Sequence, residues 1–315
     1  MSTARPPEGA HAGAREGEGS RIDASTLYDV RVAINYRYGS RVPFAKHVLR
    51  IDPENDARQE VLEASMVVEP APSERWPEID QFGNRTVMLA LDSPHDRLEV
   101  RLGARIRVHA IEPCADSPAW ESIRDAVPAM TGLSARAPAH FVFPCRMTIA
   151  DADLVDYVMP SFAPGRPILD AAADLGRRIH ADFRYAPGST TVSTTALEFM
   201  RGRAGVCQDF AHLMIAGMRA IGLPIAYVSG LLRTVPPPGS ARLEGADAMH
   251  AWVAVWGGPD IGWVGLDPTN AVFASSDHIR IGMGRAYADV APIDGVIIAA
   301  GEHANDVAVD VVPLA

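Results

Sequence analysis

Residues Gly205 to Met214 read Gly-Val-Cys-Gln-Asp-Phe-Ala-His-Leu-Met, and they are the most informative segment of the chain. Apolar residues recur at helical spacing and Gly222 is a typical stop, so a helix is predicted from Cys207 to Ile221. The first N–H groups of a helix lack partners within it, and they favour a thiolate and can bind an oxyanion. Cys207 is therefore predicted to be a nucleophile. The plainer alternative is that a lone cysteine is a small buried apolar residue.

The base that activates this thiol has to come from another part of the chain. His212 is close in sequence, but it lies about 140° around the helix from Cys207, so the two side chains face different directions. His250, in Met-His-Ala-Trp-Val-Ala-Val-Trp, is the better candidate. Asp267 follows in Trp-Val-Gly-Leu-Asp-Pro-Thr-Asn and can orient an imidazole.

These two residues lie on segments that read as a β-hairpin, with strands over 249–256 and 261–267 and a turn at 257–260. If Trp256 pairs with Ile261, the register places His250 directly opposite Asp267, with their Cβ atoms roughly 4.5–5.5 Å apart. The carboxylate would then hold the imidazole in one tautomer and leave its other nitrogen for the thiol. The alternative is a purely structural His–Asp pair beside a group of tryptophans.

Four segments are predicted along the chain. They are a disordered tail (1–24), an N-terminal antiparallel β domain resembling a sandwich (25–110), a proline-rich connector with short helices (111–165) and an α+β catalytic core (166–315). The chain ends in two strand-like runs, at 295–300 and 306–313.

The composition excludes several classes of partner. A formal charge of −10 argues against nucleic acid and anionic membranes, since both need a basic surface. No apolar window approaches the length of a membrane-spanning helix. The three cysteines, at positions 114, 145 and 207, form no Cys-x-x-Cys, so no metal or disulfide framework is predicted. We also expect no cofactor, and a reducing cytoplasm is the predicted location.

Several of these motifs together resemble the transglutaminase-like superfamily, and most closely its bacterial cysteine-protease group. They are Gly205-Val-Cys-Gln-Asp-Phe-Ala, Gly222-Leu-Pro-Ile-Ala-Tyr-Val-Ser-Gly, His250-Ala-Trp and Trp263-Val-Gly-Leu-Asp-Pro-Thr. Residues 26–109 resemble the β-rich N-terminal region of the same group. The resemblance implies a papain-like α+β core with a Cys207–His250–Asp267 triad. Tyr185 and Gln208 are further candidates for oxyanion or substrate contacts.

The predicted activity is acyl transfer through a cysteine thioester on an amide bond of a peptide or protein. Water as the acceptor gives a peptidase or amidase, which we favour; an amine gives a protein-glutamine gamma-glutamyltransferase that forms isopeptide cross-links. A third possibility is a scaffold or binding protein that keeps the fold without catalysis. The oligomeric state does not follow from the sequence.

Overall fold

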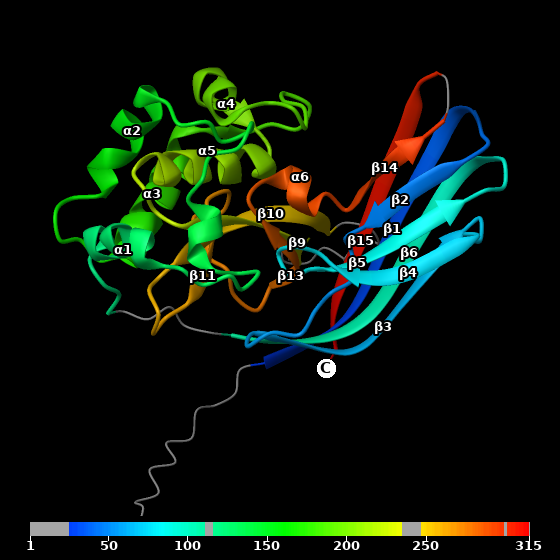
Figure 1. The fold of residues 1–315 in the computed structure, drawn as a ribbon, viewed down its shortest axis with the longest axis horizontal. Helices are drawn as coiled ribbons and strands as arrows, with labels where there is room; N and C mark the ends of the chain where they lie inside the picture. The colour runs from blue at the N-terminus through cyan, green and yellow to red at the C-terminus, as the bar shows by residue number, and fades with distance from the viewer. Residues whose placement is uncertain (1–24, 111–115, 235–246, 299–300, 315) are drawn as a thin grey trace, which may run out of the picture.

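The computed structural model of the protein describes residues 25–110, 116–234, 247–298 and 301–314. It has two parts, a β-sandwich and a helix-covered sheet, which lie side by side (Figure 1). The predicted tail at 1–24 falls outside the described residues. Among the described ranges, no helix combines the length and the apolar character needed to cross a bilayer.

Two four-stranded antiparallel sheets form the sandwich, with the orders β15-β1-β6-β3 and β14-β2-β5-β4. Along β1 and β6, every second side chain is buried between the sheets and polar residues alternate with them. The predicted antiparallel sandwich is thus confirmed. Its strands are β1 (Ser25–Val42), β2 (Ala45–Leu49), β3 (Gln59–Glu69), β4 (Glu74–Ile79), β5 (Arg85–Leu91), β6 (His95–His109), β14 (Ile293–Ile297) and β15 (His303–Leu314).

The last two strands correct one predicted boundary. The sequence assigned everything from 166 to 315 to the catalytic core, but β14 pairs with β2, and β15 pairs with β1 over most of its length. Figure 1 shows the red C-terminal strand beside the blue N-terminal one. Without these partners β1 and β2 would each expose an edge of unpaired backbone groups, and the C-terminal strands satisfy those groups. The end of the chain therefore completes the sandwich.

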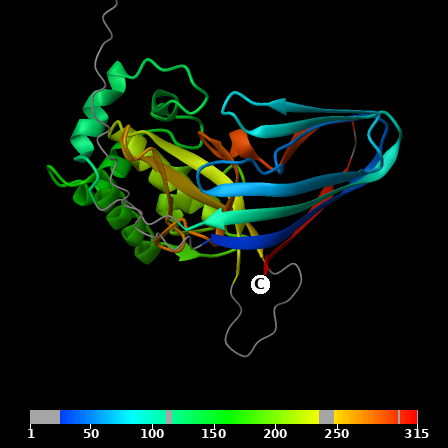
Figure 2. The ribbon, with the colours of Figure 1, turned by 90° about the horizontal axis from the view of Figure 1, so that it is seen from below.

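The second part is built on a five-stranded sheet with the order β12-β11-β10-β9-β13. Leu231 and Ile279 of this sheet belong to the apolar core of the sandwich, which joins the two parts (Figure 2). The fold class is α+β, which confirms the prediction from the sequence. The strands are β9 (Ile225–Leu232), β10 (Ala248–Trp256), β11 (Trp263–Asp267), β12 (Val272–Phe273) and β13 (His278–Gly284), and β7 (Arg184–Tyr185) pairs with β8 (Ala204–Gly205) in a small parallel ladder. The helices are α1 (Trp120–Ala126), α2 (Ala152–Val158), α3 (Ile168–Asp182), α4 (Ala196–Gly202), α5 (Cys207–Ala220) and α6 (Tyr287–Val290).

Helix α5 lies at the centre of this part and packs on β9 and β10. Nearly all its side chains are buried, so packing on every side holds it in place. A Cβ on Gly217 would lie 2.3 Å from a methyl carbon of Val158, which shows how closely α2 approaches. The helix ends at Ala220, one residue before the predicted end, and Gly222 follows with a φ of +83°. Packing along the helix thus determines where its first residue, Cys207, lies.

Candidate active site

Cys207 occupies the first position of α5, with Val206 as the N-cap residue. The carboxylate of Asp209 accepts a hydrogen bond from the Val206 N–H at 2.8 Å and another from the Thr190 hydroxyl at 2.6 Å. A Cβ on Gly205 would lie 2.5 Å from this carboxylate, so the loop needs a glycine here. These contacts fix the turn that presents the half-buried thiol at the start of the helix.

His250 links the thiol to the carboxylate of Asp267. Its side chain, on β10, is 7% exposed, and its Nε2 lies 2.8 Å from Asp267 Oδ2. The hydrogen bond with Asp267 leaves Nδ1 of the ring free, and Cys207 is near enough to the ring to affect its pKa. Burial disfavours the imidazolium, but the interactions with Asp267 and Cys207 outweigh it and raise the pKa of His250 to about 10. The structure therefore brings the three predicted side chains together.

Asp267 is fully buried and accepts five hydrogen bonds. Its Oδ1 accepts the backbone N–H groups of Thr269 and Asn270, as expected for an Asp-Pro-Thr-Asn turn. Its Oδ2 accepts from His250 and from the Asn270 side chain, at 2.8 and 2.6 Å. Burial opposes ionisation, but hydrogen bonds with the two histidines, His250 and His278, outweigh it and hold the pKa of this carboxyl well below its ordinary value.

The hairpin that carries His250 and Asp267 has a different register from the predicted one. Trp256 pairs with Trp263 and not with Ile261, because the connection is two residues longer and spans 257–262. The continued register puts Asp267 across from Trp252, so it is not directly opposite His250 as predicted. A shift by two residues keeps Asp267 on the same face of the sheet, since side chains alternate with a period of two. The two side chains meet diagonally.

His278 is a site residue that the sequence reasoning missed. It begins β13, and its Nε2 lies 3.3 Å from Asp267 Oδ2. The nitrogens of His250 and His278 and an Asp267 oxygen lie within 4.8 Å of one another, a spacing that suits a metal ion. However, Nδ1 of His278 accepts the N–H of Ser275, so Nε2 carries the ring proton and donates to Asp267. His278 therefore acts as a hydrogen-bond donor to Asp267. No sequence motif indicated this role.

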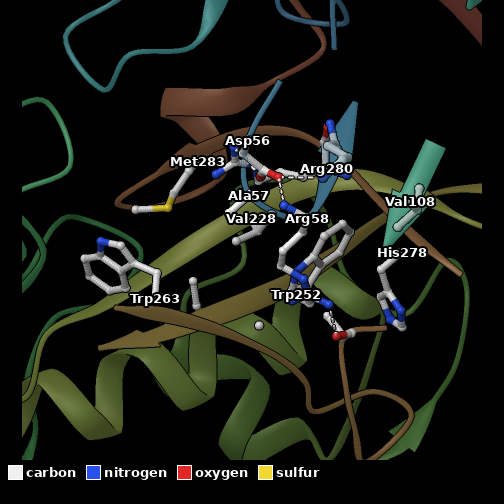
Figure 3. Close-up of a pocket in the computed structure, with 14 residues that line it drawn as sticks. Asp56, Ala57, Arg58, Val108, Val228, Trp252, Trp263, His278, Arg280 and Met283 are labelled. Atoms are coloured by element: carbon white, nitrogen blue, oxygen red, sulfur yellow. Dashed lines mark hydrogen bonds and ion pairs between the residues drawn. The ribbon is translucent and has the colours of Figure 1, made fainter. Parts of the chain in front are cut away.

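Trp252 shields the His–Asp pair from one side. Its ring lies 5.2 Å from the His278 ring and 6.2 Å from the His250 ring, between centroids. Beyond it is a cavity of about 160 Å³ between the sheet and the β2–β3 connection. Figure 3 shows Trp252 and His278 next to each other in its wall, with Trp263 at the other end. Neither Cys207 nor His250 lines this cavity, so it lies behind the reacting groups.

The two further candidates, Tyr185 and Gln208, both lie near Cys207. Tyr185, on β7, is 54% exposed, and burial of part of its ring and the nearby Cys207 raise the pKa of its hydroxyl. The Gln208 side chain donates to the carbonyl of Val192 at 3.3 Å, which leaves its backbone N–H as a first-turn donor. The roles of both residues stay predictions.

His212, which its position around the helix excludes as the base, lies in the core. It is fully buried, and its Nε2 accepts the N–H of Tyr287 at 3.2 Å. Burial and the nearby Arg219 lower the pKa of His212 to about 3. It is therefore a neutral core residue.

Two family models match the chain. The bacterial transglutaminase-like N-terminal region matches residues 28–107, and the transglutaminase-like superfamily matches residues 160–268, a range that includes Cys207, His250 and Asp267. The chain belongs to the transglutaminase-like superfamily.

Similar proteins cover nearly its full length. An uncharacterized protein of Mycobacterium tuberculosis is 38% identical over 301 residues, which are 93% of this chain and 94% of that protein. An uncharacterized protein of Mycobacterium leprae is 29% identical over 89% of this chain and 96% of its own length. A crystal structure named "Putative Cysteine Protease from Cytophaga hutchinsonii" has a TM-score of 0.72 at 22% identity, and the match covers 92% of this chain and 91% of that one. The last likeness confirms the fold.

His278 is expected to position Asp267, because it donates a buried hydrogen bond to a charged acceptor. Replacing it with phenylalanine keeps a ring beside Trp252 and should lower the free energy of unfolding at pH 7 by about 1–3 kcal/mol. Iodoacetamide labelling of Cys207 should also slow several-fold. His278→Gln retains an N–H donor and should recover part of both effects. Denaturant unfolding and mass-mapped labelling measure them, and a phenylalanine variant equal to the parent in both would remove His278 from this role.

Proposed function

We propose that this transglutaminase-like protein is a cysteine-dependent amide hydrolase, a peptidase or amidase that acts on peptides or proteins. The observation that carries the proposal is the position of His250, which hydrogen-bonds the carboxylate of Asp267 and lies near enough to the thiol of Cys207 for the two groups to affect each other's ionisation. In this proposal Cys207 is the nucleophile, His250 the base and later the acid, and Asp267 the group that orients the imidazole.

The reaction begins with His250 Nδ1 taking the proton of the thiol. The sulfur then attacks the amide carbonyl, and the oxygen gains a negative charge in the tetrahedral intermediate. When the carbon–nitrogen bond breaks, the His250 imidazolium gives its proton to the departing amine, and a thioester with Cys207 remains. Water then attacks the thioester while His250 accepts a proton from it. The acid leaves and the proton returns to the sulfur.

The developing oxyanion needs donors beside the sulfur. The backbone N–H groups of Cys207 and Gln208 belong to the first turn of α5, where helical partners are lacking. They also lie at the positive end of the helix, which favours negative charge. Tyr185 is the further candidate donor, because its hydroxyl is close enough to Cys207 for their charges to interact.

Exposure of the site supports water as the acceptor over an amine. Cys207 is half-buried and Tyr185 beside it is exposed, so a thioester on the sulfur would be within reach of solvent. A transferase has to keep water from this intermediate. A reducing cytoplasm remains the compartment that we propose for a free catalytic thiol.

Incubating the protein with a peptide library, with and without a primary amine, tests the proposal. We expect peptide fragments or deamidated side chains whose masses are unchanged by the added amine. Products that carry the amine in place of ammonia would instead establish the transferase. The Cys207→Ala variant is the control, and products that persist with it would point to a contaminating enzyme. If the parent protein gives no product under either condition, the hydrolase proposal is wrong.

A further inference from the structure

A second group of polar side chains lies inside the sandwich, on strands β1, β2 and β6. These strands are on the side of the molecule away from α1, α2 and α3 (Figure 1). Tyr38 on β1 and His95 on β6 come from one sheet, and His47 on β2 comes from the other. All three are at least nine-tenths buried, with exposed fractions of 9%, 7% and 6%. The transglutaminase-like site does not involve any of them.

Each of these side chains has a buried polar atom without a hydrogen-bond partner among the described residues. The atoms are Tyr38 Oη, His47 Nε2 and His95 Nε2. Buried polar groups are nearly always paired, because leaving one unpaired costs its desolvation. Three such atoms on neighbouring side chains inside one sandwich suggest a shared partner.

The tautomers of the two histidines indicate what that partner is. Nδ1 of His95 lies 2.8 Å from the carbonyl oxygen of Ser93, which only accepts, so Nδ1 carries the proton. Nδ1 of His47 lies against the backbone of β14 at Gly295, and the neighbouring backbone of Asp294 favours the protonated ring, as a carbonyl oxygen facing an N–H does. A proton on Nδ1 leaves Nε2, which has no partner among the described residues, as the unprotonated nitrogen. Both Nε2 atoms therefore present a lone pair.

Tyr38 lies next to both histidines. The Tyr38 and His95 rings meet edge to face with centroids 5.6 Å apart, and His47 and Tyr38 line one cavity of about 210 Å³, which opens beside β14. His95 is not in the lining of this cavity, but it is near enough to His47 to lower the pKa of that ring. A Cβ on Gly295 would lie 2.7 Å from His47 Nδ1, so this nitrogen faces the backbone of β14 and Nε2 faces the other way.

We propose that His47, His95 and Tyr38 form a binding site for a divalent transition-metal ion such as Zn²⁺. Histidines that bind a metal through one nitrogen usually donate the other N–H to a carbonyl, as His95 does to Ser93, and Nδ1 of His47 faces the backbone of β14. Imidazole nitrogens with an additional oxygen ligand suit Zn²⁺, Cu²⁺ and Ni²⁺. The ion would connect β2 in one sheet with β1 and β6 in the other. His278 of the candidate active site differs from His47 and His95, because its Nε2 carries a proton and donates it in a hydrogen bond to Asp267.

The test uses the full-length protein after treatment with a chelator, with Zn²⁺ in calorimetry and Co²⁺ as a spectroscopic probe. We expect about one ion per chain and a Co²⁺ spectrum without thiolate charge-transfer bands, which separates this site from the cysteines. His47→Gln and His95→Gln should each weaken Zn²⁺ binding by about 100-fold or more. Mutating a residue that only hydrogen-bonds a metal ligand already lowers metal affinity by about 10- to 100-fold. His140→Gln, a histidine of the connector bonded to the Ser134 carbonyl, should leave binding unchanged.

Tyr38→Phe keeps the test valid if the histidine variants fail to fold, because it removes only the hydroxyl oxygen and leaves the ring in place. It should weaken binding about tenfold while the circular dichroism spectrum stays that of the parent. Any one of three results would overturn the proposal. They are no binding of Zn²⁺ by the parent protein, as expected if ordered water fills the site; thiolate charge-transfer bands in the Co²⁺ spectrum; and unchanged affinity in both histidine variants.

Discussion

Replacing Cys207 with alanine is expected to lower amide hydrolysis by about 10,000-fold or more, because the thioester can no longer form. The variant should fold normally, since Cys207 is half-buried at the very start of α5 and the burial of the remaining turns holds the helix. Cleavage of a peptide identified from the library measures the loss, and circular dichroism checks the fold. Cys207→Ser should be nearly as inactive, because His250 is matched to a thiol.

Cys145→Ser is the matched control for this prediction. Cys145 is also free and half-buried, but its sulfur contacts Thr148 Oγ1, which also accepts a hydrogen bond from the buried Arg219, far along α5 from the first turn. Its exchange should leave turnover within about twofold of the parent. Should Cys207→Ala retain hydrolysis that survives repurification, another nucleophile is at work. A scaffold would lack turnover in every variant, the parent included.

Local sequence signals predicted much of the candidate site. Helix start and stop residues placed α5 to within one residue, and a thiol at the helix start follows from that alone. Alternating apolar residues predicted the sandwich and both strands of the hairpin. Each of these signals depends on residues close together in the chain.

The parts that were missed depend on long-range packing. The register of β10 and β11 is set by how the glycines at 257, 258 and 262 fold the connection, with positive φ at two of them. His278 reaches Asp267 only because the chain from β12 returns across the sheet to β13 on its other edge. Likewise, the strand-like C-terminal runs gave no sign that their partners are the first strands of the chain. No local pattern encodes these pairings.

Replacing Asp267 with asparagine is expected to slow turnover by about 100- to 10,000-fold, because the imidazole loses its orienting charge. The buried carboxylate accepts hydrogen bonds on both oxygens. An amide group would therefore face donors in either orientation, with His250 and His278 on one side and two backbone N–H groups on the other. Labelling of Cys207 by iodoacetamide at pH 6 gives a readout that needs no substrate and should fall at least tenfold. Asp260→Asn, in the exposed turn of the same hairpin, is the matched control.

The same variant should change how stability depends on pH. The pKa of His250 is about 10 in the folded protein, above its ordinary value of 6.5, so the folded state binds this proton more tightly. The resulting stabilisation is fully present below pH 6.5 and is lost as the pH rises towards 10. Asp267→Asn removes a main cause of the raised pKa, so the parent's advantage in unfolding free energy should be largest at pH 6 and shrink by pH 10. Denaturant unfolding at pH 6, 8 and 10 measures it, and a constant difference would mean that Asp267 does not hold the proton on His250.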